Sequence, residues 1–217
     1  MTYPQEPARS RRARQNPPAA WIFFRQWLKN PLRMAALSPS GRQLARQMIA
    51  ELPANAARIV ELGAGTGVFT RAMLESGITP RNLLVVELND ELYEHLNHTF
   101  PDARIVHGNA IELKALAERD GFLSRGPVDA IISGLGLLSM SRTVQRSILE
   151  AAFSVLKPGG RLIQFTYGPS SPVPRELLAE LGLQVRRAGI AWRNVPPASV
   201  YVYTRNRSEA IHAQRAG

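Results

Sequence analysis

Three glycines at alternate positions, Gly63, Gly65 and Gly67, directly follow the apolar run Arg58–Leu62. Glycine adopts the positive φ that other residues avoid, and it lets a ligand approach the backbone closely. A helical pattern over Gly67–Ser76 comes next, so the glycines join a buried strand to a helix. In open parallel sheets, ligands bind outside the carboxyl ends of the strands, where this turn would lie. The turn therefore predicts an α/β fold with a ligand site at its glycines.

The same alternation of strand and helix continues along the chain. Strands that alternate with helices are typical of a parallel sheet. The last two predicted strands have no helix between them, which indicates a terminal antiparallel hairpin. The sequence thus predicts a Rossmann-like, mostly parallel seven-stranded sheet. The further strands are Leu83–Leu88, Arg104–His107, Val128–Ser133, Arg161–Thr166, Leu183–Arg193 and Ser199–Thr204, and the further helices are Gly41–Leu52 after an N-cap at Ser40, Asp90–Thr99, Ser141–Leu156 and Pro174–Leu181.

Basic residues gather at the two ends of the chain, whose formal net charge is +10. Residues 1–46 carry nine Arg and Lys against one Glu, and residues 186–217 carry six Arg against one Glu. This distribution favours an anionic partner, a membrane surface or a nucleic acid, over a simple gain in solubility. The absence of cysteine excludes disulfides and thiolate metal sites and fits a cytoplasmic protein. The four histidines are not spaced as ligands, so we expect no metal.

The residues before the first predicted strand divide into two parts. Residues 1–18 are rich in proline and arginine, and we expect a disordered basic tail. Within residues 19–36, the aromatic side chains of Trp21–Leu28 share one helical face, which is typical of a helix at a membrane interface. This run is too short to span a bilayer and has no secretory cleavage pattern. A helix packed on the sheet is the alternative. The α/β domain would follow at 37–207, and a tail at 208–217.

Two acidic residues accompany the glycine turn. Glu61 precedes it, and Glu87 ends the second predicted strand, where a carboxylate can bind both hydroxyls of a ribose. A nicotinamide dinucleotide is the competing ligand. Its fingerprint has the spacing Gly-x-Gly-x-x-Gly, however, and Val68 occupies the last of those positions.

The stretch Glu61–Gly67 resembles the first motif of class I S-adenosylmethionine (SAM)-dependent methyltransferases. The resemblance implies SAM as cofactor and S-adenosylhomocysteine as product, with Glu87 at the ribose and Gly108–Ala110 around the adenine. Asn109 stands where the family usually has Asp, and its amide oxygen can still accept from the exocyclic amine. The expected cofactor-binding residues are Glu61, Gly63, Gly65, Thr66, Gly67, Glu87, Leu88, Asn109, Ala110 and Ser133.

Four further segments resemble the small bacterial phospholipid N-methyltransferases, which convert phosphatidylethanolamine towards phosphatidylcholine. They are Phe23–Pro31, Leu37–Ser40, Tyr167–Pro172 and Asn194–Arg205. The resemblance implies methylation of phosphatidylethanolamine and of its mono- and dimethyl forms. It also implies a peripheral location on the inner face of the cell membrane.

Such a reaction needs little chemistry from the protein, because the sulfonium methyl is already activated and the enzyme mainly positions the amine. Tyr167, just past the fifth predicted strand, is the candidate catalytic residue that orients this amine. Arginine and serine side chains would bind the lipid phosphate, and the turn after the fourth strand would meet the amine and the acyl chains. The expected substrate-binding residues are Trp21, Arg25, Ser38, Ser40, Gly134, Leu135, Arg193 and Arg205.

Two other functions compete with this interpretation. A ribosomal RNA adenine N-methyltransferase has a similar first motif and would suit a basic chain. Those enzymes carry an Asn-x-Pro-Tyr-like motif after the fourth strand, where this chain has Ser133–Gly136. A non-enzymatic membrane-binding module is disfavoured by the intact glycine turn and Glu87. We therefore expect a monomer that binds a phospholipid substrate and an anionic membrane surface, and no nucleic acid.

Overall fold

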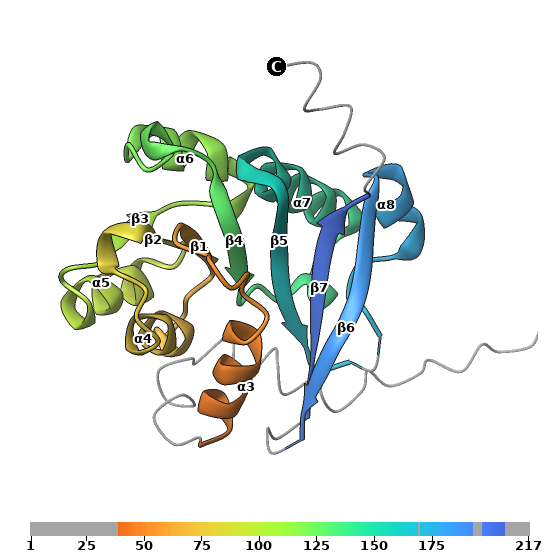
Figure 1. The fold of residues 1–217 in the computed structure, drawn as a ribbon, viewed down its shortest axis with the longest axis horizontal. Coiled ribbons are helices and arrows are strands. Elements are labelled where there is room, and N and C mark those ends of the chain that lie inside the picture. Colours follow the sequence, from red (N-terminus) through yellow and green to blue (C-terminus); the bar gives the residue numbers. More distant parts are fainter. Residues whose placement is uncertain (1–38, 169, 193–196, 207–217) are drawn as a thin grey trace, which may run out of the picture.

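A seven-stranded sheet forms the centre of the molecule (Figure 1), and the computed structural model describes residues 39–168, 170–192 and 197–206. The strands are β1 (Ile59–Leu62), β2 (Leu83–Glu87), β3 (Arg104–His107), β4 (Val128–Ser133), β5 (Leu156–Thr166), β6 (Leu183–Ala191) and β7 (Ala198–Arg205). The helices are α3 (Pro39–Ile49), α4 (Val68–Glu75), α5 (Asp90–Thr99), α6 (Leu113–Arg119), α7 (Arg142–Val155) and α8 (Arg175–Glu180). Short 3-10 turns are η1 (Pro80–Asn82), η2 (Ala110–Glu112), η3 (Leu123–Arg125) and η4 (Leu137–Ser139).

The strand order is β3-β2-β1-β4-β5-β7-β6. The pairs from β3 through β5 are parallel, whereas β7 is antiparallel to both β5 and β6. The predicted Rossmann-like sheet with an antiparallel C-terminal hairpin is therefore confirmed. Strands β1, β2 and β4 are buried along their whole length, as expected of parallel strands that are covered on both faces.

Helices cover the two faces of the sheet (Figure 1), and a hydrophobic cluster lies on each face. On one face, α3, α4 and α5 contribute Met48, Met73 and Leu96 in turn to a cluster with strand residues such as Ile132. On the other, α6, α7 and α8 pack on the alternate strand residues, such as Leu62. The period of two along each strand assigns neighbouring side chains to opposite layers. The sheet thus lies between two hydrophobic clusters, which hold its strand ends in a fixed relation.

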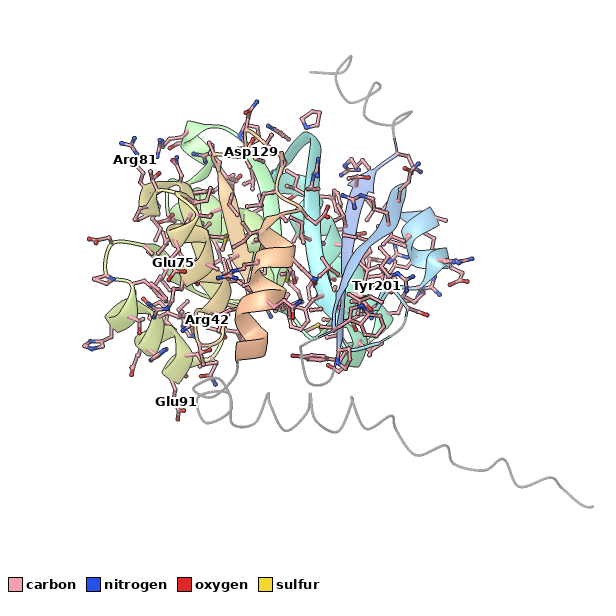
Figure 2. All side chains as sticks on the ribbon, turned by 60° about the horizontal axis from the view of Figure 1, so that its bottom comes forward. Arg42, Glu75, Arg81, Glu91, Asp129 and Tyr201 are labelled. Atoms are coloured by element: carbon pink, nitrogen blue, oxygen red, sulfur yellow. The ribbon has the colours of Figure 1, made fainter. Side chains whose placement is uncertain are left out.

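The carboxyl ends of the parallel strands define one edge of the sheet, which we call the carboxyl edge. The register places Leu62 beside Ser133, Ser133 beside Gln164, and Gln164 beside Tyr201. Helix α3 begins near this edge, because a Cβ on Gly41 would lie 3.5 Å from Cγ1 of Val68. In Figure 2, Arg42 and Glu91 lie toward this side of the molecule and Asp129 lies toward the opposite edge.

Three elements differ most from the sequence-based expectations. Helix α3 starts at Pro39, so Ser40 lies in its first turn and is not the N-cap. Helix α6 was missed altogether. Strand β5 begins at Leu156, directly after α7, and includes Lys157–Gly160, which we expected as a turn. Pairing of Leu156 with Val128 and a register shift in β4 extend the strand through this segment. The predicted N-terminal helix and both tails lie outside the described residues.

Candidate active site

The glycine turn lies at the carboxyl edge between β1 and α4. All three glycines have positive φ, at 66° for Gly63, 58° for Gly65 and 79° for Gly67. A Cβ on Gly63 would lie 2.6 Å from Cδ2 of Leu135, and one on Gly67 would overlap the ring of Phe100. The turn is thus closely packed where a side chain on Gly63 or Gly67 would lie. A turn of this shape can accept a ligand only at its bare backbone.

Glu87, at the end of β2, is connected to this turn through its carboxylate. Its Oε2 accepts from the N–H of Gly65 at 2.9 Å, and its Oε1 accepts from the N–H groups of Leu88 and Asn89 at 2.9 and 3.0 Å. The side chain is 6% exposed. A carboxylate offers about four lone-pair sites, so these three donors leave room for a ligand hydroxyl. The sequence assigned Glu87 to a ribose, and the structure adds a second role in holding the glycine turn.

Glu61 lies beneath the turn and is fully buried. Its Oε2 accepts from the hydroxyl of Thr70 at 2.5 Å, and its Oε1 has no hydrogen-bond partner among the described residues. Burial raises the pKa of this carboxyl to about 8, although the Thr70 hydrogen bond opposes the shift. A buried oxygen with spare accepting capacity next to the turn suits a ligand ammonium or hydroxyl.

The residues expected around an adenine lie on the β2–β3 side of the turn. Leu88 is 61% exposed. Oδ1 of Asn109 accepts from the N–H of Ile111 at 3.1 Å and caps η2, so this oxygen already has one donor. Ala110 is buried in the layer under α6 and α7, which leaves only its backbone to meet a ligand. Thr66 is half-buried in the turn itself.

The loop that follows β4 packs against the glycine turn on its other side. The N–H of Gly134 donates to the carbonyl of Leu62 at 2.8 Å, and a Cβ on Gly134 would overlap the carbonyl oxygen of Gly63. The hydroxyl of Ser133 is buried and accepts from the N–H of Leu135 at 3.3 Å. Leu135 is half-buried over Gly63. The predicted substrate loop and the predicted cofactor turn are therefore in direct contact.

Tyr167 follows the end of β5 at the same edge. Its ring packs edge-on against Phe165 with centroids 5.4 Å apart, and Phe165 packs in the same way against Phe69 of α4 at 5.7 Å. Tyr167 is half-buried, whereas Phe165 is 5% exposed. The aromatic row fixes the Tyr167 ring and gives this side of the edge a π surface that can attract a cation.

Arg205 was wrongly expected at the substrate site. Because β7 runs antiparallel to β5, its last residue lies at the edge opposite the carboxyl edge. There the guanidinium lies 5.7 Å from the centroid of the Phe153 ring, and its Nη2 donates to the Phe153 carbonyl at 3.4 Å. Trp21, Arg25, Ser38 and Arg193 lie outside the described residues, and only the helical backbone of Ser40 is described.

Two buried amides near the site were missed by the sequence analysis. Gln164 of β5 is fully buried, and its Nε2 donates to the carbonyl of Leu135 at 2.8 Å. Gln145 of α7 is 4% exposed and donates to the carbonyl of Leu137 at 2.7 Å. The signal for Gln164 was present, because a polar residue interrupts an otherwise apolar strand. No cluster of three potential metal ligands occurs within residues 39–168, 170–192 and 197–206.

Comparison with known proteins agrees with this geometry. Residues 60–162 match the family model of a methyltransferase domain. The ornithine lipid N-methyltransferase of Singulisphaera acidiphila is 27% identical over 187 residues, which cover 83% of this chain and 93% of that protein. The crystal structure of the glycopeptide N-methyltransferase MtfA with SAM superposes with a TM-score of 0.59 at 13% identity, over 76% of this chain and 94% of that one.

A second solved structure has a similar overlap. The TehB-like SAM-dependent methyltransferase of Corynebacterium glutamicum superposes with a TM-score of 0.55 at 19% identity, over 88% of this chain and the whole of that one. The fold is therefore that of the Rossmann-like class I methyltransferases. With the family match across its glycine turn, the chain is a SAM-dependent methyltransferase.

The residues at the turn fit SAM on their own geometry. The positive-φ glycines carry no side chain that would cover the turn, Glu87 keeps a free lone-pair site, and Glu61 keeps an oxygen without a hydrogen-bond partner among the described residues. When bound there, SAM would supply an activated methyl group on a sulfonium. The protein's part would be to hold that group beside an acceptor, and Leu135 and Tyr167 follow the neighbouring strands β4 and β5 at the same edge.

Proposed function

We propose that this methyltransferase transfers methyl groups from SAM to the amine of phosphatidylethanolamine, and to its mono- and dimethyl forms. The observation that carries the proposal is the likeness to a lipid N-methyltransferase along most of both chains. A lipid amine is thus the favoured class of acceptor. The resemblance of Tyr167–Pro172 and Asn194–Arg205 to phospholipid N-methyltransferases favours phosphatidylethanolamine within that class.

The reaction is a direct transfer from sulfur to nitrogen. The neutral amine attacks the methyl carbon in line, an N–C bond forms as the S–C bond breaks, and the ammonium product then loses a proton before the next transfer. Alignment of the amine supplies most of the rate enhancement in a reaction of this kind. The Tyr167 hydroxyl is the group that we propose orients the amine. Its aromatic row would also attract the ammonium that becomes more methylated at each step.

We further propose that the enzyme acts on the cytoplasmic side of an anionic membrane surface. The large apolar side chains that are exposed among the described residues all follow strands at the carboxyl edge: Leu88, Ile111, Leu138 and Trp192. Trp192 is 71% exposed and Leu138 is 48% exposed. The basic and aromatic residues of 1–38 join the domain through α3 at this edge. No described helix is long and apolar enough to cross a bilayer.

Methyl transfer from radiolabelled SAM tests the acceptor directly. The full chain is incubated with vesicles that contain phosphatidylethanolamine, with vesicles that contain ornithine lipid, or with total RNA. We expect label in methylated phosphatidylethanolamines. Label in ornithine lipid alone would correct the acceptor but keep a lipid amine, whereas label in RNA alone would overturn the proposal. Glu87→Ala serves as the inactive variant, with Glu94→Ala on the exposed face of α5 as its matched control.

Vesicle co-sedimentation tests the membrane surface. The full chain should bind anionic vesicles more strongly than neutral ones, and added salt should weaken the binding because surface charge attraction is screened. Removal of residues 1–30 should release the protein from the vesicles. Equal binding with and without this segment would contradict its role at the interface.

A further inference from the structure

Two loops bound the acceptor side of the site at the carboxyl edge. The first, which we call the β4 loop, covers residues 134–141 and carries Leu135. The second, which we call the β5 loop, covers residues 167–174 and begins with Tyr167. They follow neighbouring strands, since Ser133 pairs with Gln164, and a Cβ on Gly168 would lie 3.7 Å from Cδ2 of Leu138. The relative position of the two loops therefore sets the space beside Tyr167.

Gln145 connects these two loops from beneath. Its Nε2 donates to the carbonyl of Leu137 in the β4 loop at 2.7 Å and to the carbonyl of Pro172 in the β5 loop at 3.1 Å. A longer contact of 3.5 Å joins it to the carbonyl of Met140. Gln145 projects from the end of the first turn of α7, whose core side packs on the sheet. One amide group on a rigid helix thus holds both loops.

The contacts of this amide are inaccessible to water. Gln145 is 4% exposed, and its Oε1 has no hydrogen-bond partner among the described residues. A buried polar atom without a partner costs free energy, so the two bonds of Nε2 are made despite that cost. An apolar side chain of similar size would avoid the unpartnered oxygen, but the carbonyl of Pro172 would lose this donor and that of Leu137 would keep only the N–H of Met140. The amide at this position is accordingly better explained by its hydrogen bonds to the two loops than by packing in the core.

Each loop also has its own attachment to the sheet. Gln164 donates to the carbonyl of Leu135 at 2.8 Å, and the hydroxyls of Ser171 and Tyr203 lie 2.8 Å apart. These bonds hold one loop each. The two bonds of Gln145, in contrast, join one loop to the other.

We propose that Gln145 is a positioning residue for the methyl acceptor, because it fixes the β4 loop against the β5 loop and so sets the place of Tyr167 beside Leu135. This role rests on the proposed function, since it concerns the side of the site that a lipid amine would enter. Without the amide, the loops separate and the acceptor is held less often in line with the methyl group. Binding of SAM at the glycine turn does not depend on this bond.

The distance between the loops tests the connection without any assumption about the acceptor. The chain has no cysteine, so Leu138→Cys and Ser170→Cys, both at exposed positions, provide a unique pair of sites for spin labels. With Gln145 present, we expect a narrow distribution of distances in pulsed electron paramagnetic resonance. In Gln145→Met the distribution should broaden. An unchanged distribution would overturn the proposal, whatever the substrate is.

Kinetics on the unlabelled protein test the consequence for the acceptor. For Gln145→Met we expect kcat/KM for the lipid acceptor to fall at least tenfold, while Kd for SAM stays within about twofold of the wild type. Gln145→Asn keeps an amide but has a shorter reach, and it should give a smaller loss. If kcat/KM falls as much in Gln145→Asn as in Gln145→Met, or if SAM binding falls in parallel with activity, Gln145 contributes to folding in general and the proposal is wrong.

Gln47→Met is the matched control. Gln47 of α3 also donates its Nε2 to a backbone carbonyl, that of Ile190 at 3.2 Å, but it joins neither loop. It should leave the spin-label distances and the acceptor kinetics unchanged. The distance distribution could broaden in Gln145→Met although the wild-type protein methylates no lipid. In that case the connection between the loops is supported and the proposed acceptor is wrong. Should Gln145→Met not fold, Gln145→Asn carries both measurements.

Discussion

The N–H of Gly65 donates to Oε2 of Glu87 across 2.9 Å, so the glycine turn after β1 is held by the carboxylate that ends β2. The same carboxylate accepts from the N–H groups of Leu88 and Asn89. A residue whose sequence position suggests contact with a ribose thus also shapes the turn on which the cofactor lies. Loss of the Glu87 charge should therefore weaken the binding of SAM more than it weakens the binding of the acceptor.

Glu87→Gln should raise the Kd for SAM by about tenfold or more. Its amide nitrogen would face backbone N–H groups, and hydrogen bonds to a charged group contribute about 1.5–3 kcal/mol, whereas 1.4 kcal/mol corresponds to a factor of ten. Isothermal titration calorimetry with SAM measures the change. Glu94→Gln, an exposed carboxyl on the following helix, should bind SAM as the wild type does. Equal affinity in the two variants would exclude the proposed contact.

Gly63→Ala should destabilise the protein more than Gly121→Ala does. Both glycines have similar positive φ, 66° and 73°, so each alanine meets a backbone cost of about 1–2 kcal/mol. A Cβ on Gly63 would additionally lie 2.6 Å from Leu135, whereas one on Gly121 meets nothing within 4 Å. Thermal unfolding of the two variants isolates the contact of the turn with the β4 loop. If their Tm values coincide, that contact adds nothing to stability.

The stability of the protein should fall between about pH 4.5 and 8 through Glu61. Burial raises the pKa of this carboxyl from 4.5 to about 8, so in that interval the folded state holds a proton that the unfolded chain has lost. Its contribution is complete below pH 4.5 and is lost as the pH rises through 8, with a slope of up to about 1.4 kcal/mol per pH unit.

Glu61→Gln removes this titration while keeping the size of the side chain. The difference in Tm between Glu61→Gln and the wild type should therefore shift in favour of the variant as the pH is raised from 5 to 8. Each kcal/mol corresponds to about 2–4 °C for a chain of this size. Glu75→Gln, an exposed carboxyl on α4 (Figure 2), should show a constant difference. A constant difference for Glu61→Gln as well would mean that Glu61 is ionised throughout.

Tyr167→Phe should separate the two roles proposed for this side chain. If the hydroxyl orients the amine, kcat should fall about tenfold to a hundredfold, the effect of one hydrogen bond to a group that becomes charged. The ring contact with Phe165 would persist, so Kd for SAM should not change. Tyr93→Phe, on α5 next to His107, is the control. Full activity of Tyr167→Phe would mean that the hydroxyl has no role and that only the aromatic ring contributes.

Elements with a strong local signal were predicted from the sequence. Strands β3 and β4 and helix α5 have the bounds that we expected, and Asn89 caps α5 by accepting from the N–H of Leu92. Helix α6 was missed, although Leu113, Leu116 and Ala117 show the helical spacing. The start of β5 depends on pairing with Val128, a partner far away in the sequence.

Candidate site residues were likewise predicted where the local sequence carries a strong signal. Glu61, Glu87 and the glycines could be found because their chemistry stands at strand ends, where the fold gathers ligands. Arg205 was expected at the wrong edge of the sheet, because the direction of β7 decides at which edge its last residue lies. The pattern of apolar residues in a strand does not show in which direction the strand runs. Gln145 was not found because its partners are carbonyls of two distant loops, Leu137 and Pro172. Contacts of an amide with backbone have no local signature.

The reversed direction of β7 has a practical consequence. Arg205 ends the last strand at the edge opposite the glycine turn, whereas α3 begins beside Val68 at the edge that carries it. A solid support or a fluorescent reporter joined beyond Asn206 would start from the edge opposite the glycine turn and leave the carboxyl edge open. The same attachment ahead of Pro39 would crowd that face. Surface-immobilised enzyme should accordingly be oriented through its final strand.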